Sequence, residues 1–382
     1  MRVRQLDRLR TFRNRVTGRT SQRFLEVLSP GEPIGLDASY FLPLDLEPNQ
    51  TGSFDTLFHE IEVVPMLETL DKEAIELMNL EPGTRFMSRE ELLDASLALL
   101  ERVIETNWSS TKVHFVAHSS GWDSRLISAL IRRIYERRGS SWLGEVIFSC
   151  CGTESPGFRA IMEYEGWEPS RYAAFEDLED FCDFELDLSQ VWRWANGPML
   201  FARSPKTYMI RRLQEAGRLP PEDQIQAWSG YGTNSGVHAY ANAREGNRIE
   251  ERYGVVYRHH ESLDFYPASE EILPFSHYDV LRLGVESSCR LGSDRRMQML
   301  ERFDPELFAL PKLVSHWPNL QAERMEKMQA DYLASWYGRN VQPRAIEVIS
   351  SATRGYCTWW SYWTAAGLVE HLLNGGYDIQ VG

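Results

Sequence analysis

The sequence has few cysteines, no long apolar run and a shortage of positive charge. Five cysteines, an odd number spread thinly over 382 residues, exclude a disulfide framework. No stretch approaches the roughly 18 consecutive apolar residues of a membrane span, and the Arg-rich start has no apolar segment behind it to make a secretory signal. We therefore expect a cytoplasmic protein with no membrane partner. A mitochondrial transit peptide, which is also Arg-rich and acid-poor, stays open as an alternative.

The acidic residues outnumber the basic ones, 55 to 41, and the resulting net charge of −14 argues against general coating of nucleic acid. The balance is uneven along the chain. Residues 1–23 hold eight arginines against the single acid Asp7, a charge of +7 that leaves −21 for the remainder. Apolar residues spaced three or four apart predict a basic helix or arm through about Val27. Its arginines either face water or bind phosphate or nucleic acid.

The chain divides at a segment rich in Pro and Gly, residues 29–53, which is typical of loops. Ser88, followed by Glu91 and a periodic apolar run, predicts a helix with a capped N-terminus. We therefore predict that residues 1–85 form a basic arm and a small region of unassigned fold. Residues 86–382 form the second domain.

A strand, a turn, a helix and a second strand follow one another after residue 112. The strands are predicted over 113–118 and 145–150, the small polar turn over 119–124 and the helix over 126–135. This order places backbone N–H groups and hydroxyls at a helix N-terminus, where the dipole favours phosphate. Parallel strands joined in this way predict an α/β sheet with its ligand at the carboxyl edge.

The polar turn resembles the SGGxDS pyrophosphate-binding loop of the N-type ATP pyrophosphatases. The continuation Arg125-Leu126-Ile127 resembles the asparagine synthetase branch of that superfamily. Ser120 replaces the first glycine of the loop, which adds a Cβ where the backbone must approach phosphates closely, and Trp122 stands at the variable position. The matching residues are Ser119, Gly121, Asp123 and Ser124.

A second match begins about a hundred residues further on. Residues 195–199, a predicted helix and residues 226–232 resemble the D-x-P segment, helix and SGxGxDE strand end of the synthetase family. They add Ser229, Gly230 and Gly232 to the nucleotide-binding residues. The resemblance covers roughly residues 88–317. It implies an α/β fold of the adenine nucleotide alpha hydrolase-like, ATP pyrophosphatase type, with a parallel sheet, flanking helices and a helical C-terminal part.

The sequence departs from the family in two places. The acidic pair of the second loop is replaced by Asn234 and Ser235, and Tyr231 stands at a variable position that is often acidic in the family. Loss of two carboxylates should weaken binding of a hard dication. Residue 2 is Arg2 where full-length members of the family expose a cysteine, so we expect no glutaminase domain. Nitrogen would then come from free ammonia, an amine substrate or a partner.

The resemblance implies an ATP-dependent, amide-forming ligase. Ser119, Ser120, Gly121 and Ser124 would hold the pyrophosphate of ATP, and Mg²⁺ would bridge Asp123, with Asn234 as a second ligand, to the phosphates. A small-molecule carboxylate would attack the α-phosphorus, and an amine or ammonia would then displace AMP. The catalytic candidates are Lys312, Arg296 and Tyr231.

Three alternatives stay open at this point. The first is that the chain is a degenerate synthetase, which binds nucleotide without turnover or depends on a partner for its activity. The second is that the chain is an ATP pyrophosphatase that modifies nucleic acid, which the basic arm would guide to the site. The third concerns Asp123 alone, which could be a helix cap rather than a metal ligand.

Overall fold

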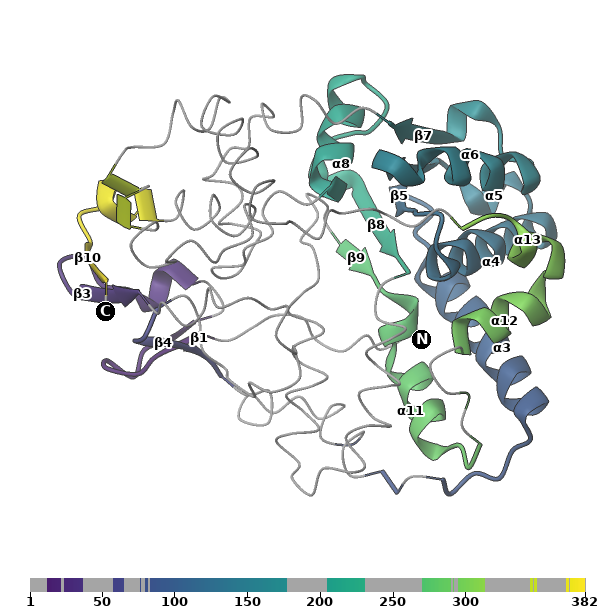
Figure 1. Cartoon of the computed structure of the whole chain (residues 1–382), viewed down its shortest axis with the longest axis horizontal. Helices are drawn as coiled ribbons and strands as arrows, with labels where there is room; N and C mark the ends of the chain where they lie inside the picture. Colours follow the sequence, from purple (N-terminus) through teal and green to yellow (C-terminus); the bar gives the residue numbers. More distant parts are fainter. Residues whose placement is uncertain are drawn as a thin grey trace. The chain divides into compact units, whose positions relative to one another are not determined.

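A computed structural model describes residues 12–21, 24–36, 58–64, 76, 80, 81, 83–176, 205–230, 270–289, 291, 295–312, 344, 345, 347, 348, 369, 370 and 372–381 (Figure 1). The chain forms two compact units, each assembled from segments that are far apart in the sequence. Unit 1 comprises Met1–Asp7, Lys72–Leu178 and Pro205–His316, and unit 2 comprises Arg8–Asp71, Glu179–Ser204 and Trp317–Gly382. The predicted division at residue 85 stays a prediction.

A five-stranded sheet forms the centre of unit 1, and every pair of neighbouring strands is parallel. The spatial order is β7-β6-β5-β8-β9, so the chain builds one half of the sheet outward from β5 and then returns to build the other. The predicted α/β fold class with a parallel sheet is confirmed. The strands are β5 (Val113–Ala117), β6 (Val146–Cys151), β7 (Tyr172–Phe175), β8 (Ile225–Ser229) and β9 (Glu270–Ile272).

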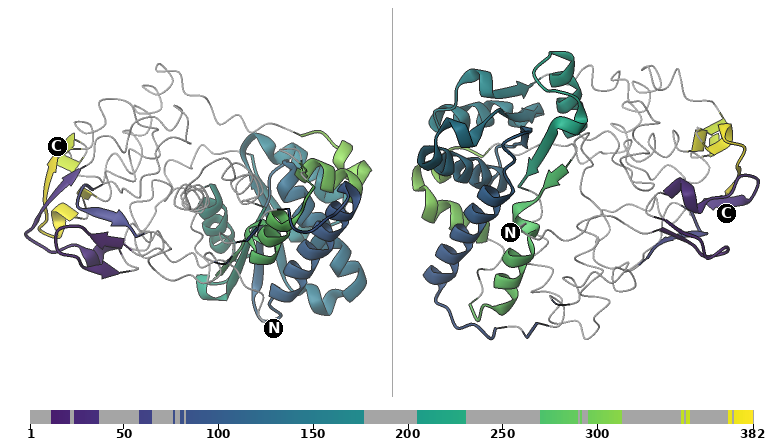
Figure 2. Two further views of the ribbon diagram at one scale, coloured as in Figure 1. Left: turned by 90° about the horizontal axis from the view of Figure 1, so that it is seen from below. Right: turned by 180° about the vertical axis from the view of Figure 1, so that it is seen from behind.

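Helices cover both faces of this sheet (Figures 1 and 2). They are α3 (Arg89–Asn107), α4 (Trp122–Arg138), α5 (Ser140–Leu143), α6 (Ser155–Tyr164), α8 (Pro205–Glu215), α11 (Tyr278–Glu286), α12 (Arg295–Phe303) and α13 (Pro305–Ala309). Short 3-10 helices connect them: η3 (Gly152–Glu154), η4 (Pro169–Arg171), η6 (Glu222–Gln224) and η7 (Pro274–Ser276).

The alternation of side chains along a strand decides which helix covers which face. Phe148 of β6 and Trp228 of β8 belong to the apolar core that also holds Leu130 and Ile131 of α4. Ser149 points the other way, and its hydroxyl contacts the sulfur of Met209 on α8 at 3.2 Å. Helices α3 and α4 therefore pack on one face and α8 on the other. Burial of one leucine or isoleucine in such a core contributes about 1.5–3 kcal/mol.

Helix α3 begins where the sequence predicts. The Ser88 hydroxyl accepts from the backbone N–H of Glu91 at 3.2 Å, and the Glu91 carboxylate accepts from the backbone N–H of Ser88 at 2.7 Å. This reciprocal pair satisfies two of the N–H groups that a helix start leaves without partners. The predicted capped helix is confirmed.

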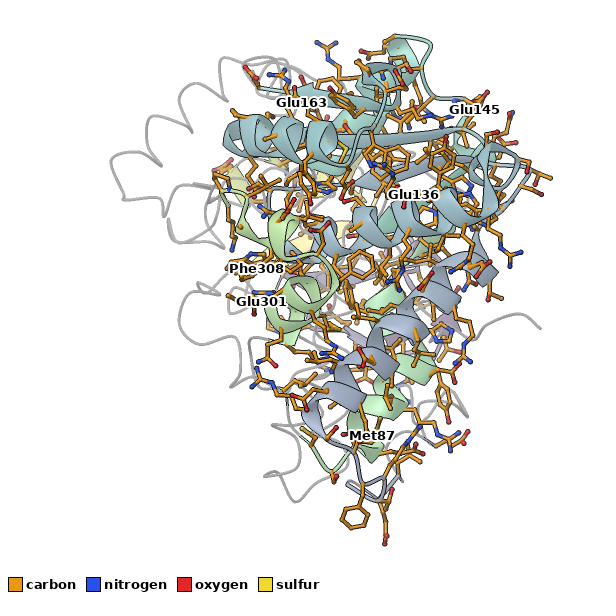
Figure 3. The ribbon with its side chains drawn as sticks, turned by 90° about the vertical axis from the view of Figure 1, so that its right-hand side faces the viewer. Met87, Glu136, Glu145, Glu163, Glu301 and Phe308 are labelled. Atoms are coloured by element: carbon orange, nitrogen blue, oxygen red, sulfur yellow. The ribbon has the colours of Figure 1, made fainter. Side chains whose placement is uncertain are left out.

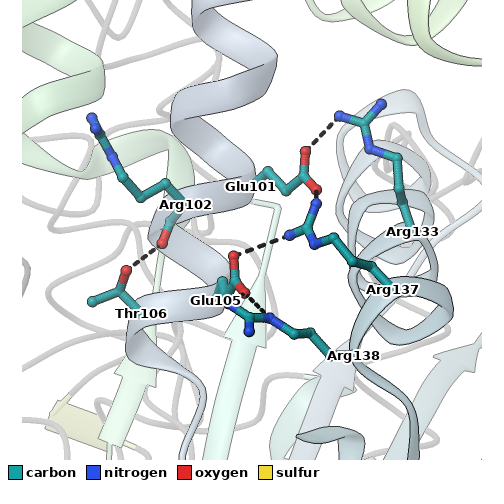
Figure 4. A network of polar contacts seen from close by, with 7 residues as sticks. All are labelled: Glu101, Arg102, Glu105, Thr106, Arg133, Arg137 and Arg138. Carbon is teal, nitrogen blue, oxygen red and sulfur yellow. Dashed lines mark hydrogen bonds and ion pairs between the residues drawn. The ribbon is translucent and has the colours of Figure 1, made fainter.

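Ion pairs join the outer sides of α3 and α4 (Figure 4). The Glu101 carboxylate accepts from Arg133 at 2.5 Å and from Arg137 at 2.6 Å, and Glu105 pairs with Arg137 at 3.0 Å and with Arg138. The two arginines beside Glu101 hold the pKa of its carboxyl below its ordinary value, against the opposing effect of burial. The pairs therefore add modestly to the packing of α4, whose first turn carries the predicted phosphate loop, along α3.

The described part of unit 2 contains two small sheets. The antiparallel sheet has the order β2-β1-β4, and in the other sheet β10 lies parallel to β3. The strands are β1 (Phe12–Asn14), β2 (Thr20–Ser21), β3 (Pro33–Leu36), β4 (Ile61–Val63) and β10 (Asp378–Val381), and the 3-10 helix η1 covers Phe24–Val27.

The prediction of a basic helix through Val27 is wrong for the described part of the arm. The Asn14 side chain accepts from the backbone N–H groups of Val16 and Thr17 at 2.9 and 3.0 Å, and Gly18 adopts a positive φ of 71°. These contacts form a tight turn that folds β2 back on β1. Phe12 is buried while Val16 is exposed, so the apolar spacing does not mark one helical face.

Within the described segments, no helix is both long enough and apolar enough to cross a bilayer.

Candidate functional site

The strand order predicts a ligand site at the carboxyl ends of β5 and β8. The chain proceeds from β5 to β6 and β7 on one side, and then crosses to β8 and β9 on the other. In a doubly wound sheet the loops separate at this switch point, and ligands bind in the crevice between them. The loop after β5 is residues 118–121, and β8 ends at Ser229 and Gly230. The two sequence motifs therefore meet at the position that the topology predicts for a ligand.

Hydroxyl hydrogen bonds hold the loop after β5 closed. The Ser124 hydroxyl accepts from the backbone N–H of Ser119 at 3.0 Å and lies 3.0 Å from the Ser119 hydroxyl. The Ser119 hydroxyl in turn accepts from the backbone N–H of Gly121 at 3.0 Å. Gly121 is the N-cap residue of α4 and has no side chain, so no side chain caps the first turn of this helix. A helix that begins in this way presents its dipole to an anion.

Gly230 lies against the first turn of α4. A Cβ added to Gly230 would lie 2.7 Å from the carbonyl carbon of Asp123 and 2.8 Å from the backbone nitrogen of Ser124. Both are backbone atoms, so they cannot move aside as a flexible side chain would. The glycine is therefore required for close packing of the β8 loop on the β5 loop.

The Arg125 guanidinium fixes the loop to a distant segment of the chain. Arg125 is fully buried, and the segment that it binds follows α12 and includes α13. It donates to five backbone carbonyl oxygens, those of Ser120 at 2.7 Å, Leu307 at 2.9 Å, Phe308 at 3.4 Å, Leu310 at 2.8 Å and Pro311 at 3.1 Å. Figure 3 shows α12 and α13, labelled at Glu301 and Phe308, beside α4.

Helix α12 and the segment after it supply two cations to the first turn of α4. Arg296 Nη1 lies 3.0 Å from Asp123 Oδ2, with 22% of the Arg296 side chain and 27% of the Asp123 side chain exposed. Lys312 Nζ lies 4.1 Å from the centre of the Trp122 ring. Trp122 and Asp123 are the first two residues of the helix, so the two cations flank its N-terminus.

Glu154 lies on the neighbouring side of the site, after β6. The Ser120 hydroxyl donates to its carboxylate at 3.3 Å. Burial raises the pKa of Glu154 above its ordinary value, while the Ser120 hydrogen bond and the charge of Lys312 act in the opposite direction. Glu154 therefore keeps its proton up to a higher pH than an exposed glutamate would.

The described residues do not fit the Mg²⁺ predicted for this site. The Asp123 carboxylate is paired with a guanidinium, which repels a dication, and Asn234 lies outside the described residues. No group of three or more His, Cys, Asp or Glu side chains that could hold a metal occurs among the residues described. A hard dication prefers several carboxylate oxygens, and this part of the chain does not gather them.

The structure brings together most of the predicted site residues. Ser119, Ser120, Gly121, Asp123 and Ser124 form the β5 loop and the start of α4, Ser229 and Gly230 end β8, and Arg296 and Lys312 flank the helix start. Tyr231, Gly232 and Asn234 lie outside the described residues, so their roles stay predictions. Sequence reasoning did not identify Arg125 as a residue that holds the loop in place, and it did not identify Glu154 at all. The only signal for Glu154 was its place after a strand whose carboxyl end lies at the ligand edge.

A buried chain of polar groups supports the loop from beneath. His118 Nε2 lies 3.1 Å from the Ser128 hydroxyl, and Ser128 Oγ lies 2.7 Å from Glu165 Oε1 and 3.0 Å from the backbone oxygen of Arg125. The Trp167 indole N–H donates to Glu165 Oε2 at 2.7 Å. The single Ser128 hydroxyl proton cannot be donated both to Glu165 and to the Arg125 backbone oxygen, so a proton on Glu165 that is donated to Ser128 completes the network. Burial raises the pKa of Glu165 to about 8, which agrees with a protonated carboxyl at neutral pH.

Two buried histidines have pKa values shifted in the direction that burial dictates for a base. Burial lowers the pKa of His118 to about 3 and that of His114 to about 4. His114 Nδ1 accepts from the Trp228 indole N–H at 3.0 Å, so its Nε2 carries the proton and donates to the backbone oxygen of Ser109 at 2.8 Å. Both imidazoles are therefore neutral at neutral pH.

These three groups predict a stability maximum near pH 6.5. Between about pH 4.5 and 6.5 the unfolded chain protonates both histidines while the folded chain does not, so stability rises with pH despite the opposite effect of Glu165. Above about pH 6.5 only Glu165 contributes, because its folded form keeps a proton that the unfolded form has lost. Stability then falls by roughly 1.4 kcal/mol per pH unit until about pH 8.

Glu165→Gln tests this assignment, because glutamine reproduces the protonated acid with one acceptor for Trp167 and one donor for Ser128. Thermal unfolding followed from pH 6 to pH 8 should lose most of its downward slope in the variant. The matched control is Glu163→Gln, which changes an exposed glutamate two residues away, in the last turn of α6 (Figure 3), and should keep the wild-type slope. An unchanged slope in the Glu165 variant would show that this carboxyl is ionised in the folded protein.

Comparison with known proteins gives no family assignment. No family model matches the chain, and no curated protein sequence does. Among solved structures, the U34-tRNA thiolase NcsA from Methanococcus maripaludis, determined with its [4Fe-4S] cluster, is similar over 70% of this chain and 78% of that chain, with 13% sequence identity and a TM-score of 0.33. A similarity this low does not establish a common function.

Proposed function

We propose that the crevice between the carboxyl ends of β5 and β8 binds the phosphates of ATP, and that the chain transfers AMP to an oxygen nucleophile of a substrate. The observation that carries the proposal is the meeting of two phosphate-loop motifs, about a hundred residues apart, at the switch point of the sheet. Their contact is close enough to require Gly230. Arg296 and Lys312 add positive charge at the same helix start.

The described residues suit phosphoryl chemistry, in which most of the protein's contribution is positioning and charge stabilisation. The substrate oxygen forms a bond to the α-phosphorus, the bond from the α-phosphorus to the bridging oxygen breaks, and pyrophosphate leaves with the electron pair. Lys312 and the first turn of α4 stabilise the charge on the departing phosphates. Arg125 keeps Lys312 in place by binding the carbonyl groups that precede it.

A carboxylate is the nucleophile that the asparagine synthetase resemblance suggests. The acyl-adenylate then reacts with an amine or ammonia, which forms an amide, releases AMP and gives up a proton to solvent. Nucleic acid is the second candidate substrate, although the described arginines of the basic arm already have partners within unit 2. Arg13 and Arg15 pair with Glu62 at 2.5 and 2.9 Å, and Arg19 donates to the backbone oxygen of Leu28 at 3.3 Å.

Pyrophosphate release from ATP tests the proposal, measured across a panel of carboxylates, amines and transfer RNA. Lys312→Met should lower substrate-dependent pyrophosphate release by about tenfold to a hundredfold, because one stabilising charge is removed from the transition state. Lys112→Met is the matched control, since Lys112 precedes β5 at the opposite, amino edge of the sheet and its loss should leave the rate unchanged.

Each outcome of the panel leads to a definite conclusion. Pyrophosphate and AMP formed only with a carboxylate and an amine would support the ligase. Release that depends on transfer RNA would keep adenylation and replace the substrate class. ATP binding without any release would identify a binding protein, and the absence of ATP binding would refute the proposal.

A further inference from the structure

The carboxylate expected to bind a divalent cation is instead held by an arginine. Asp123 Oδ2 and Arg296 Nη1 are 3.0 Å apart, and both side chains are mostly buried. A partly buried ion pair of this geometry is stronger than an exposed one, because solvent screens it less. A dication that took Asp123 would have to displace the guanidinium or lie beside it, and both alternatives cost electrostatic free energy.

The fold supplies cations to the same place. Arg296 lies in the first turn of α12, and Lys312 follows α13. The Arg125 guanidinium binds the backbone oxygens of Leu310 and Pro311, immediately before Lys312, and also that of Ser120 in the loop. The position of the cations relative to the loop therefore depends on the packing of α4 against α12 and on the hydrogen bonds from Arg125 to α13 and the residues after it.

We infer that this site, which rests on the nucleotide function proposed above, binds the polyphosphate of its ligand through Arg296 and Lys312 without needing a divalent cation. A guanidinium carries five N–H donors in a rigid fork that matches phosphate oxygens. Arg296 can keep its bond to Asp123 and donate to a phosphate, so that Asp123 orients the arginine rather than ligating a metal. The chemical class of ligand is a metal-free di- or triphosphate.

Calorimetric titration with ATP and with inorganic pyrophosphate, in excess EDTA and in excess MgCl₂, tests this inference. The wild-type dissociation constant in EDTA should be equal to that in MgCl₂, within about threefold, or tighter. Arg296→Gln should weaken binding in EDTA by about tenfold or more, because it removes a charge-assisted hydrogen bond. The same variant should regain part of its affinity in MgCl₂, since Asp123 is then available to a cation.

Asp123→Asn separates the two roles of the carboxylate. An asparagine oxygen can still accept from Arg296 but is a poorer ligand for a hard dication, so the variant should keep the wild-type ratio of affinities in EDTA and in MgCl₂, within about threefold. Arg302→Gln is the matched control, because Arg302 lies on the same helix and pairs with Asp94 of α3 at 2.5 Å, and both buffers should give wild-type affinity. Thermal unfolding of each variant confirms that it is folded.

The outcomes distinguish this inference from the proposed function. ATP binding that weakens more than about threefold in EDTA, with this difference lost in Asp123→Asn, would overturn the inference and leave the nucleotide site intact. No binding of ATP or pyrophosphate in either buffer would overturn both.

Discussion

Gly230→Ala is expected to abolish measurable ATP binding. The added Cβ would lie within 2.8 Å of two backbone atoms of Asp123 and Ser124, so the end of β8 must move away from the first turn of α4. A displacement of this kind separates the two loops that together form the site. Overpacking costs about 1–3 kcal/mol of stability, which unit 1 should survive. Calorimetry with ATP and thermal unfolding measure the two effects on the same sample.

Gly139→Ala is the control for loss of stability alone. Gly139 follows the far end of α4 with a φ of 81°, and a Cβ there would contact nothing within 4 Å. The substitution therefore strains the backbone by about 1–3 kcal/mol without touching the site, because the ψ of Gly139 is −177°. It should lower the unfolding temperature to a similar degree and leave ATP affinity unchanged. ATP binding that survives in Gly230→Ala would show that the two loops need not touch to form a site.

Arg125→Met is expected to destabilise the protein by about 3–5 kcal/mol, because it leaves buried carbonyl groups without a donor. Those groups lie in the β5 loop and in the segment that carries Lys312, so the variant should also weaken ATP binding wherever it stays folded. Arg125→Lys should be intermediate, since an ammonium has three donors and lacks the planar fork. Urea unfolding followed by tryptophan fluorescence gives the change in free energy.

The control for Arg125 is Arg132→Met on the same helix. Arg132 pairs with Glu136, and the Glu136 side chain is more than half exposed. An exposed pair contributes about 0–1 kcal/mol, so this variant should unfold close to the wild type. Equal losses in the two variants would contradict the structural role assigned to Arg125.

Local features of the sequence predicted the local structure of unit 1. Ser88 and Glu91, three residues apart, form the capping box that their spacing predicts. The short apolar runs near residues 113 and 146 form β5 and β6. The polar turn between β5 and its helix supplied the candidate site. Each of these signals lies within a few residues, where backbone sterics and side-chain capping decide the conformation.

Contacts between distant residues could not be predicted in the same way. Asp123 and Arg296 are 173 positions apart, and no local pattern in the sequence marks them as a pair. The carbonyl groups bound by Arg125 have no signature in the sequence at all, because every residue has one. In the arm, spacing alone suggested a helix, whereas the hydrogen bonds of Asn14 and the conformation of Gly18 favoured a hairpin.

The most direct test of the phosphate site is hydrogen exchange of the wild-type protein with and without ATP. If the crevice between β5 and β8 binds the phosphates, ATP should slow exchange in peptides that cover residues 119–125 and Gly230. Peptides from the amino edge of the sheet, such as residues 109–113, should be unaffected. Protection confined to other segments, with these two peptides unchanged, would contradict the account.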